Sequence, residues 1–319
     1  MKYFLFLVCS LVFLACNKEN TLETEISKIT VDLDIERFDK LFAQTTESEL
    51  PQLKQTYPFL FPKRITDSVW VEMLKDTLQQ EILREVDSKF SDFDAVELEI
   101  RKFYQHLKYY DKVFKEPRLI TVINNVDYRE SIVVTDSIAL IALDNYLGED
   151  HYFYDFISVY LRKNFKPESI SVNLAEAYAE KYTYQTSRKT LLDEMIYFGK
   201  LLYFKDVMLP FKSDAEKIGY TEEEINWAHT NEAQVWSYLV DGAFLFSTDN
   251  SLPARFITPA PFSKFYLEID NESPGRIGQY IGWQIIKAYM RQNNEVDVFK
   301  MMQTSTQEIF DNTKYKPTK

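Results

Sequence analysis

Two carboxylate side chains lie where a soluble helix would place apolar residues. Glu232 is the clearer case, because it follows Ala228 by four residues and precedes Val235 by three, within the apolar stripe of a helix expected over 222–246. Burying a carboxylate costs several kcal/mol unless it is paired or hydrogen-bonded. The position of Glu232 therefore predicts a basic or hydrogen-bonding partner inside the fold.

The second carboxylate is Glu194, three residues after Leu191 and four before Phe198. The segment 191–204 around it is apolar on nearly every side, which is typical of a buried helix. Asp193 precedes Glu194, and Tyr197 lies one turn later. We expect two acidic residues on two buried helices to form the one constellation that resembles a catalytic site.

Arg276 is a candidate partner for either carboxylate, since its guanidinium is a planar fork of donors. It belongs to a glycine-rich block with Gly275, Gly278 and Gly282, which matches neither a dinucleotide fingerprint nor a phosphate loop. We expect the Pro-Gly pair ending at Gly275 to turn the chain into a helix over 276–291. Gly278 and Gly282, four residues apart, would let that helix approach a neighbour closely.

The sequence contains few residues arranged so that they could bind a metal ion. The three histidines, His106, His151 and His229, show no i, i+4 pairing. Zinc in proteins is held mainly by nitrogen and sulfur ligands. We therefore predict no metal site and no bound cofactor.

The elements that must position these side chains are mostly helices. Apolar periodicity predicts helices over 35–42, 68–90 and 93–114, and a capping box at Thr221 and Glu224 starts the helix that carries Glu232. Between these groups, two runs rich in Ile, Val, Leu and Thr, 118–126 and 131–143, predict paired strands. The expected fold class is α+β, mainly helical, with a small central β-sheet.

The N-terminus has the pattern of an export signal. Lys2 is followed by an apolar run over 3–14 that is too short to span a bilayer, and Ala15 and Cys16 come next. This order resembles the processing site of bacterial lipoproteins; an ordinary secretory signal with an incidental cysteine is the alternative. We expect a signal peptide over 1–15, lipid on Cys16, a tether over 16–25 and a single globular domain over 26–315.

Composition narrows the partners. The formal net charge is −12, so nucleic acid and anionic membrane surfaces would be repelled. Hydrophobic residues make up 45% of the chain, which is enough for a substantial core. The two cysteines are Cys9, within the expected signal, and Cys16, so no thiol remains for a disulfide or for catalysis.

The residues around Glu194 resemble the H-E-x-x-H helix of predicted zincin-type metallopeptidases. In that comparison Asp193 and Tyr197 replace the two histidines, Glu194 matches the general base, and Glu232 matches the downstream glutamate ligand. The resemblance implies a degenerate zincin-like fold in which Asp193, Glu194, Tyr197 and Glu232 are relic positions and no catalytic residue remains.

A closer resemblance covers essentially the whole mature chain. The chain is similar to the GldB family of gliding-motility lipoproteins of the Bacteroidota in four blocks: 143–148, 231–236, 260–265 and 272–283. The family implies an envelope lipoprotein, anchored in the outer membrane and facing the periplasm, that serves gliding together with type IX secretion and movement of surface adhesins. We expect a non-catalytic scaffold or adaptor whose partners are the membrane and other gliding proteins. A residual metal-dependent peptidase or hydrolase is the alternative.

Overall fold

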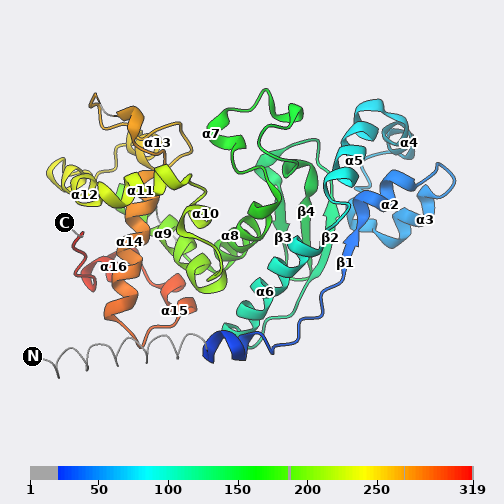
Figure 1. Ribbon diagram of the computed structural model, residues 1–319. Coiled ribbons are helices and arrows are strands. Elements are labelled where there is room, and N and C mark those ends of the chain that lie inside the picture. The colour runs from blue at the N-terminus through cyan, green and yellow to red at the C-terminus, as the bar shows by residue number, and fades with distance from the viewer. Residues whose placement is uncertain (1–20, 186–187, 269, 318–319) are drawn as a thin grey trace, which may run out of the picture.

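The structure is a computed structural model that describes residues 21–185, 188–268 and 270–317 (Figure 1). The expected signal peptide and Cys16 lie outside the described residues. Of the expected tether, residues 21–25 belong to a helix that spans 21–26. Ile26 is buried, and the carboxylate of Glu23 lies 3.2 Å from Nε2 of His106, so this helix packs against the folded body.

A four-stranded sheet in the order β1-β2-β4-β3 forms the centre of the N-terminal half. Its strands are β1 (Ile35–Arg37), β2 (Arg118–Val122), β3 (Ile132–Val134) and β4 (Ile138–Ala142). β1 and β4 both run parallel to β2, and β3 is antiparallel to β4 at the edge. The run 131–143, expected to be one strand, is therefore two strands, β3 and β4, joined by a tight turn. Of these two, β4 pairs with β2, and that pairing is parallel.

Alternate residues of β2 and β4 face two separate cores, as the period of two in a strand requires. Leu119 and Ile141 face the large core, which includes α6 (Asp94–Tyr110) and α8 (Ile170–Tyr182). Ile120 and Leu140 face a smaller core on the other side. A strand that is buried on both faces has a nearly continuous apolar sequence. The strands of this sheet could therefore be recognised as apolar runs in the sequence.

The smaller core lies under a group of short helices next to the sheet (Figure 1). They are α2 (Phe38–Gln44), α3 (Leu50–Thr56), η1 (Pro58–Leu60), α4 (Asp67–Lys75) and α5 (Thr77–Lys89). The helix predicted over 68–90 is broken at Asp76, whose side chain accepts a hydrogen bond from the backbone N–H of Gln79 and caps α5. An aspartate favours such a cap over a helix interior.

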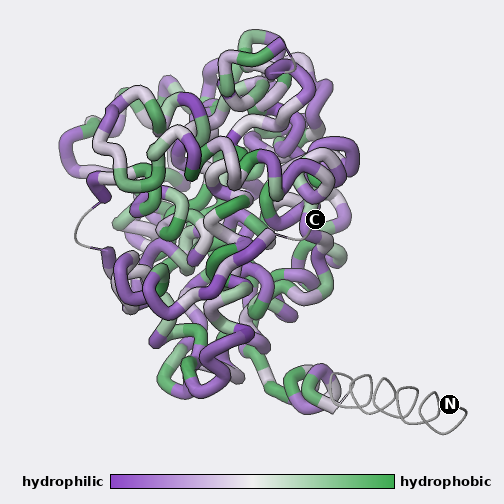
Figure 2. The backbone as a smooth tube through the Cα atoms, turned by 90° about the vertical axis from the view of Figure 1, so that its left-hand side faces the viewer, coloured by the Kyte–Doolittle hydropathy of each residue, from purple (hydrophilic) through white to green (hydrophobic). Residues whose placement is uncertain are grey.

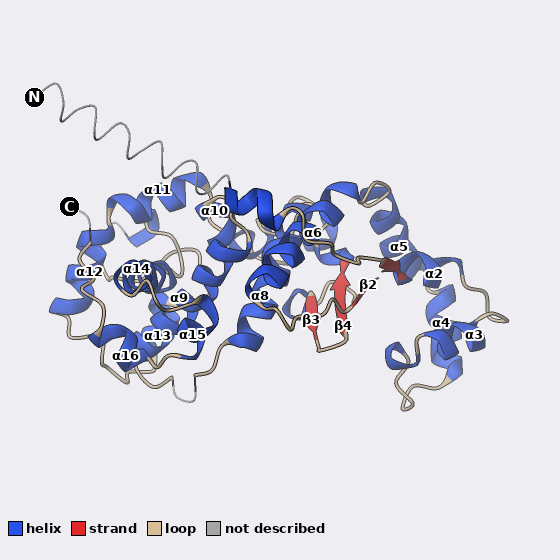
Figure 3. Cartoon of the chain, turned by 90° about the horizontal axis from the view of Figure 1, so that it is seen from below, coloured by secondary structure: helices blue, strands red, loops and turns tan. Residues whose placement is uncertain are grey.

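The C-terminal half is helical and is built around α9 (Leu191–Met208) and α14 (Ile277–Gln292), which pack against each other. Figure 3 looks along α14 and shows the other helices around this pair. They are α10 (Asp214–Ile218), α11 (Glu222–Thr230), α12 (Glu232–Asp241), α13 (Ser251–Phe256), α15 (Val298–Gln303) and α16 (Thr306–Asp311). The central position of α9 explains its apolar sequence, because neighbours cover it on most sides.

Short helical elements lie in the segments between the longer helices and strands. They are α7 (Val159–Arg162) and the 3₁₀ turns η2 (Tyr128–Glu130), η3 (Leu143–Asn145), η4 (Tyr152–Tyr154), η5 (Pro167–Ser169) and η6 (Asp270–Glu272). Figure 2 shows hydrophobic and hydrophilic residues interspersed along the backbone. Within the described ranges, no helix has both the length and the apolar composition needed to cross a bilayer.

The helix predicted over 222–246 is interrupted, so α11 and α12 are separate. At the break, the side-chain amide of Asn231 donates to the carbonyl of Trp227, a bond that competes with the helix ladder. The capping box at Thr221 and Glu224 is confirmed at the start of α11. The mainly helical α+β class with a small sheet is confirmed as well.

Candidate functional site

Asp193, at the first of the two histidine positions in the zincin comparison, serves as a helix cap. Its carboxylate accepts hydrogen bonds from the backbone N–H of Thr190 (2.9 Å) and of Lys189 (3.1 Å), and the Thr190 hydroxyl caps α9 in return. Burial acts to raise the pKa of Asp193, but the hydrogen bonds from Thr190, Lys189 and Thr306 together outweigh it and hold that pKa below its ordinary value. The carboxylate is committed to the start of α9.

Glu194 and Tyr197 share one basic neighbour, Arg188. Nε of Arg188 lies 3.5 Å from the Glu194 carboxylate, and its guanidinium carbon lies 4.1 Å from the centre of the Tyr197 ring. Burial raises the pKa of Glu194. The sequence did not indicate Arg188, because it precedes α9 in a connecting segment without periodicity.

Glu232, at the first position of α12, accepts hydrogen bonds from two tyrosines. The Tyr280 hydroxyl lies 2.8 Å from one carboxylate oxygen, and the Tyr315 hydroxyl lies 2.9 Å from the other. The Tyr280 hydroxyl is also 2.9 Å from Nδ1 of His229. The predicted hydrogen-bonding partner of Glu232 is confirmed, and the prediction that Arg276 is that partner is wrong.

The described residues bring no three His, Cys, Asp or Glu side chains together as a group that could hold a metal ion. Asp193 and Glu194 are engaged at the start of α9, and Glu232 is engaged with tyrosines from α14 and the C-terminal segment. The arrangement that the zincin comparison would require is thus taken up by structural contacts.

Arg276 immediately precedes α14 and has a left-handed backbone, with φ of 62°. Its Nη2 donates to the backbone carbonyls of Ile218 (2.8 Å) and Gly219 (3.3 Å), not to a carboxylate. A left-handed conformation is uncommon outside glycine and persists only where the surroundings impose it. Here Ser263 supplies part of that constraint, because its hydroxyl donates to the carbonyl of Pro274 and accepts from the N–H of Ile277.

The three glycines of this block all lie against other backbone segments. A Cβ on Gly275 would lie 2.1 Å from the carbonyl oxygen of Ala260, and one on Gly278 would lie 2.9 Å from that of Phe256. A Cβ on Gly282 would lie only 1.8 Å from the carbonyl oxygen of Met195 in α9. Two of the blocks that carry the family resemblance, 260–265 and 272–283, therefore meet in space around Arg276.

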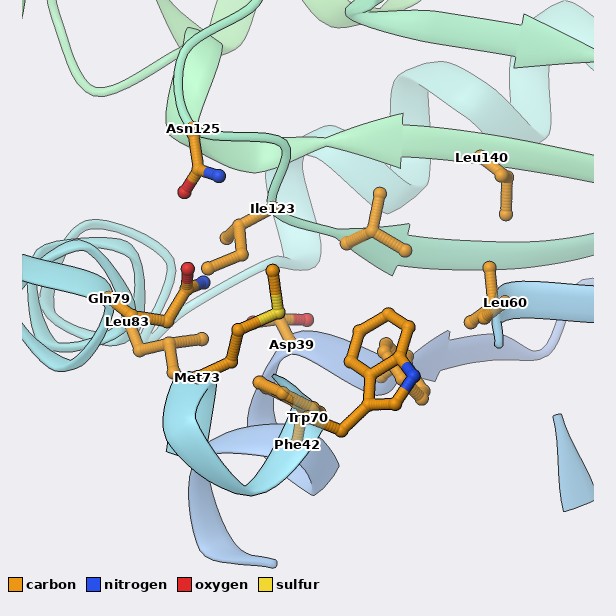
Figure 4. Close-up of a pocket in the computed structure, with 12 residues that line it drawn as sticks. Asp39, Phe42, Leu60, Trp70, Met73, Gln79, Leu83, Ile123, Asn125 and Leu140 are labelled. Carbon is orange, nitrogen blue, oxygen red and sulfur yellow. The ribbon is translucent and has the colours of Figure 1, made fainter. Parts of the chain in front are cut away.

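A cavity of about 260 Å³ lies between β2, β4 and the short helices α2, α4 and α5 (Figure 4). Its wall is mainly aromatic and aliphatic: Phe38, Phe42, Leu60, Trp70, Met73, Leu83, Val122, Ile123 and Leu140. In Figure 4 the side chains of Met73 and Ile123 extend toward each other across it. The polar members are Asp39, Gln79 and Asn125. We call this space the apolar cavity; no pattern in the sequence predicted it.

The loop at the rim of the apolar cavity is strained. Asn125 and Val126 both have left-handed backbones, with φ of 60° and 61°, and for a β-branched residue this is a genuine outlier. The fully buried carboxylate of Asp144 holds the loop by accepting from the backbone N–H of Asn124 (3.1 Å) and of Val126 (2.7 Å). Asp144 belongs to the block 143–148, so this part of the family resemblance shapes the cavity rim.

Within the cavity, Asp39 is already satisfied. Arg37 donates two hydrogen bonds to its carboxylate, at 3.0 and 2.8 Å, and the Thr121 hydroxyl donates a third. A concave, mostly apolar space with a few polar groups at its edge is the usual form of a binding site for an apolar group. The apolar cavity is the candidate binding site of this protein.

These features define a mainly helical α+β protein that has an apolar cavity beside its sheet and in which Asp193, Glu194 and Glu232 are engaged in structural contacts. Comparison with known families places it more closely. The model of the family "gliding motility protein GldB" matches residues 19–317, and the chain belongs to that family. It is therefore a gliding-motility protein. No curated protein and no solved structure matches the chain.

Proposed function

We propose that this protein is a lipid-anchored envelope lipoprotein that serves gliding motility as a non-catalytic scaffold or adaptor. Its place is the periplasmic face of the outer membrane, and its partners are other gliding proteins linked to type IX secretion and adhesin movement. Membership of the GldB family supports a role in gliding motility. The degenerate zincin-like ancestry remains part of the proposal, supported by Glu194 on the buried helix α9.

The apolar cavity is the observation that carries the adaptor role. Exposed apolar side chains stand on the elements that form its rim, with Leu78 next to Gln79 on α5 and Tyr128 three residues after Asn125. Partner proteins gain most of their binding energy from apolar anchors seated in such pockets. The partner side chain that we expect in the cavity is therefore apolar.

Filling the cavity tests this role. Ile123→Trp adds a large side chain at the rim, whereas the control Leu98→Trp makes a similar change at an exposed leucine of α6, on the other side of the sheet. We expect cells with Ile123→Trp to accumulate the protein and yet lose gliding, while cells with Leu98→Trp glide. A photo-crosslinker at Gln79 should capture an envelope protein, and Ile123→Trp should abolish the capture. Normal gliding by stable Ile123→Trp would refute the adaptor role of the cavity.

The membrane anchor is tested separately. Two acyl chains suffice for stable anchoring, so Cys16→Ala should remove both labelled fatty acid and membrane retention. Membrane retention of the unlabelled variant after detergent partitioning would contradict the anchor. Stoichiometric zinc in the purified protein, with loss of gliding on chelation, would instead favour the residual hydrolase.

A further inference from the structure

A second cavity, of about 100 Å³, lies where the segment after α7 meets the end of α10 and the start of α14. Its polar lining comes from Tyr160, Lys163, Asn164, Tyr220, Glu224 and Arg276. We call it the Arg276 cavity. Neither the adaptor role nor the anchor makes use of it.

Arg276 brings a positive charge to this cavity, and Glu176, a carboxylate on which that charge acts, is already paired with Lys205. Nη2 of Arg276 is bound to two backbone carbonyls, and among the described residues no carboxylate pairs with its guanidinium. Among the described residues, no protein acceptor binds Nε or Nη1 of Arg276. Neither nitrogen is among the buried polar atoms that lack a partner, so both are accessible. These N–H groups lie on different edges of the guanidinium, so each is available to make a separate hydrogen bond to a ligand.

Lys163 adds a second cation, and Glu224 supplies one negative charge. Nζ of Lys163 is bonded to a Glu224 carboxylate oxygen. Nζ of Lys163 and the guanidinium carbon of Arg276 lie 5.7 and 5.5 Å from the centre of the Tyr220 ring, so the tyrosine ring is a common platform for both cations. The charges of these three ionic side chains sum to one excess positive charge.

The backbone around Arg276 shows that this geometry is imposed. The Tyr220 hydroxyl donates to the carbonyl of Gly275, and the Asn164 amide donates to the carbonyl of Gly219 at 3.0 Å. Arg276 itself keeps its left-handed backbone within this frame. Strain of this kind clusters at ligand-binding sites, where it holds a side chain ready for its ligand.

We propose that the Arg276 cavity binds a carboxylate group. A carboxylate can accept charge-assisted hydrogen bonds from a free guanidinium N–H of Arg276 and from the ammonium group of Lys163, which lines the same cavity. Its single charge equals the excess charge of the cavity, whereas a doubly charged phosphate would leave one negative charge beside Glu224. The small volume admits the carboxylate and little of what it is attached to, so the rest of the ligand lies outside the cavity.

The test uses the full chain purified in detergent and ¹³C-labelled acetate as the probe, with line broadening of the acetate signal as the readout. We expect acetate to bind in competition with formate but not with chloride. Arg276→Asn, which suits a left-handed backbone, should weaken binding at least about tenfold. The control Arg129→Gln, at an exposed arginine already paired with Asp127, should bind acetate as the parent does.

A second variant protects the test against a misfolded Arg276→Asn. Lys163→Gln retains a hydrogen bond to Glu224 but removes the excess charge, so we expect weaker acetate binding and an unchanged circular dichroism spectrum. Equal broadening in the parent and both cavity variants would overturn the proposal. Stronger competition by inorganic phosphate than by formate would overturn the assignment to a carboxylate.

Discussion

Gly199 of α9 and Gly282 of α14 bring two central helices into backbone contact. A Cβ on Gly199 would lie 2.4 Å from the carbonyl carbon of Gly282, and one on Gly282 would lie 1.8 Å from the carbonyl oxygen of Met195. Both distances are far below van der Waals contact. The atoms in the way are backbone, which cannot rotate aside as a side chain can.

This contact predicts that Gly282→Ala is destabilising. Overpacking a core costs typically 1–3 kcal/mol, and with backbone on the other side we expect a loss of about 3 kcal/mol in the free energy of unfolding. Urea denaturation of the purified protein measures it. The control Arg291→Ala, at an exposed position near the end of the same helix, should change little. If Gly282→Ala unfolds at the parent's urea midpoint, the helices are not locked by this approach.

Glu232 and its two tyrosines predict a second stability effect. Glu232→Ala removes two hydrogen bonds to a charged group, leaves the Tyr315 hydroxyl without its acceptor and leaves the Tyr280 hydroxyl with His229 alone. We expect a loss of about 3 kcal/mol in the free energy of unfolding, since hydrogen bonds to charged groups contribute about 1.5–3 kcal/mol each. The melting temperature of Glu223→Ala, an exposed glutamate in the first turn of α11, should stay close to that of the parent. Equally mild effects of the two changes would mean that the tyrosines do not depend on Glu232.

Asp144 predicts a pH dependence. Burial raises the pKa of Asp144 from its ordinary 3.8 to about 6, against the opposing effect of its backbone hydrogen bonds. Between these values the folded protein holds a proton that the unfolded chain has released, so stability falls as the pH rises. The contribution is a loss of about 3 kcal/mol between about pH 4 and pH 6.

The ¹³C shift of the Asp144 carboxyl carbon, followed against pH, measures the pKa directly, and we expect a midpoint near 6. The same interval should show a falling free energy of unfolding in the parent and a flatter curve in Asp144→Asn. A carboxyl midpoint below 4 would show that the hydrogen bonds from Asn124 and Val126 outweigh burial.

Replacing Glu194 distinguishes the proposed scaffold role from a hydrolase role in living cells. Glu194→Gln keeps the shape of the side chain and much of its hydrogen-bonding capacity near Arg188, but it removes a general base. We expect the variant to accumulate and the cells to glide nearly as the parent cells do. The comparison variant Arg188→Gln, which changes the same contact from the other side, should behave alike. Non-gliding cells that contain stable Glu194→Gln protein would establish a catalytic requirement.

Much of the local structure followed from the sequence alone. The Thr221–Glu224 capping box, the buried helix α9 and the helix after Gly275 were all predicted, because their signals lie within a few residues of one another. The small sheet was visible as apolar runs, although its parallel order was not, since strand order depends on which distant segment pairs with which. The three-residue β1 was missed, because so short a strand is stabilised by its neighbour β2 and not by its own sequence.

The tertiary structure determined which atoms contact Glu232 and Arg276. The sequence required a partner for Glu232 but could not select Tyr280 and Tyr315, which lie 48 and 83 residues further along the chain. It suggested a carboxylate for Arg276, and the fold placed backbone carbonyls there instead. The energetic need of a buried group is a local property that a sequence shows, whereas the atom that meets the need is chosen by how distant helices pack.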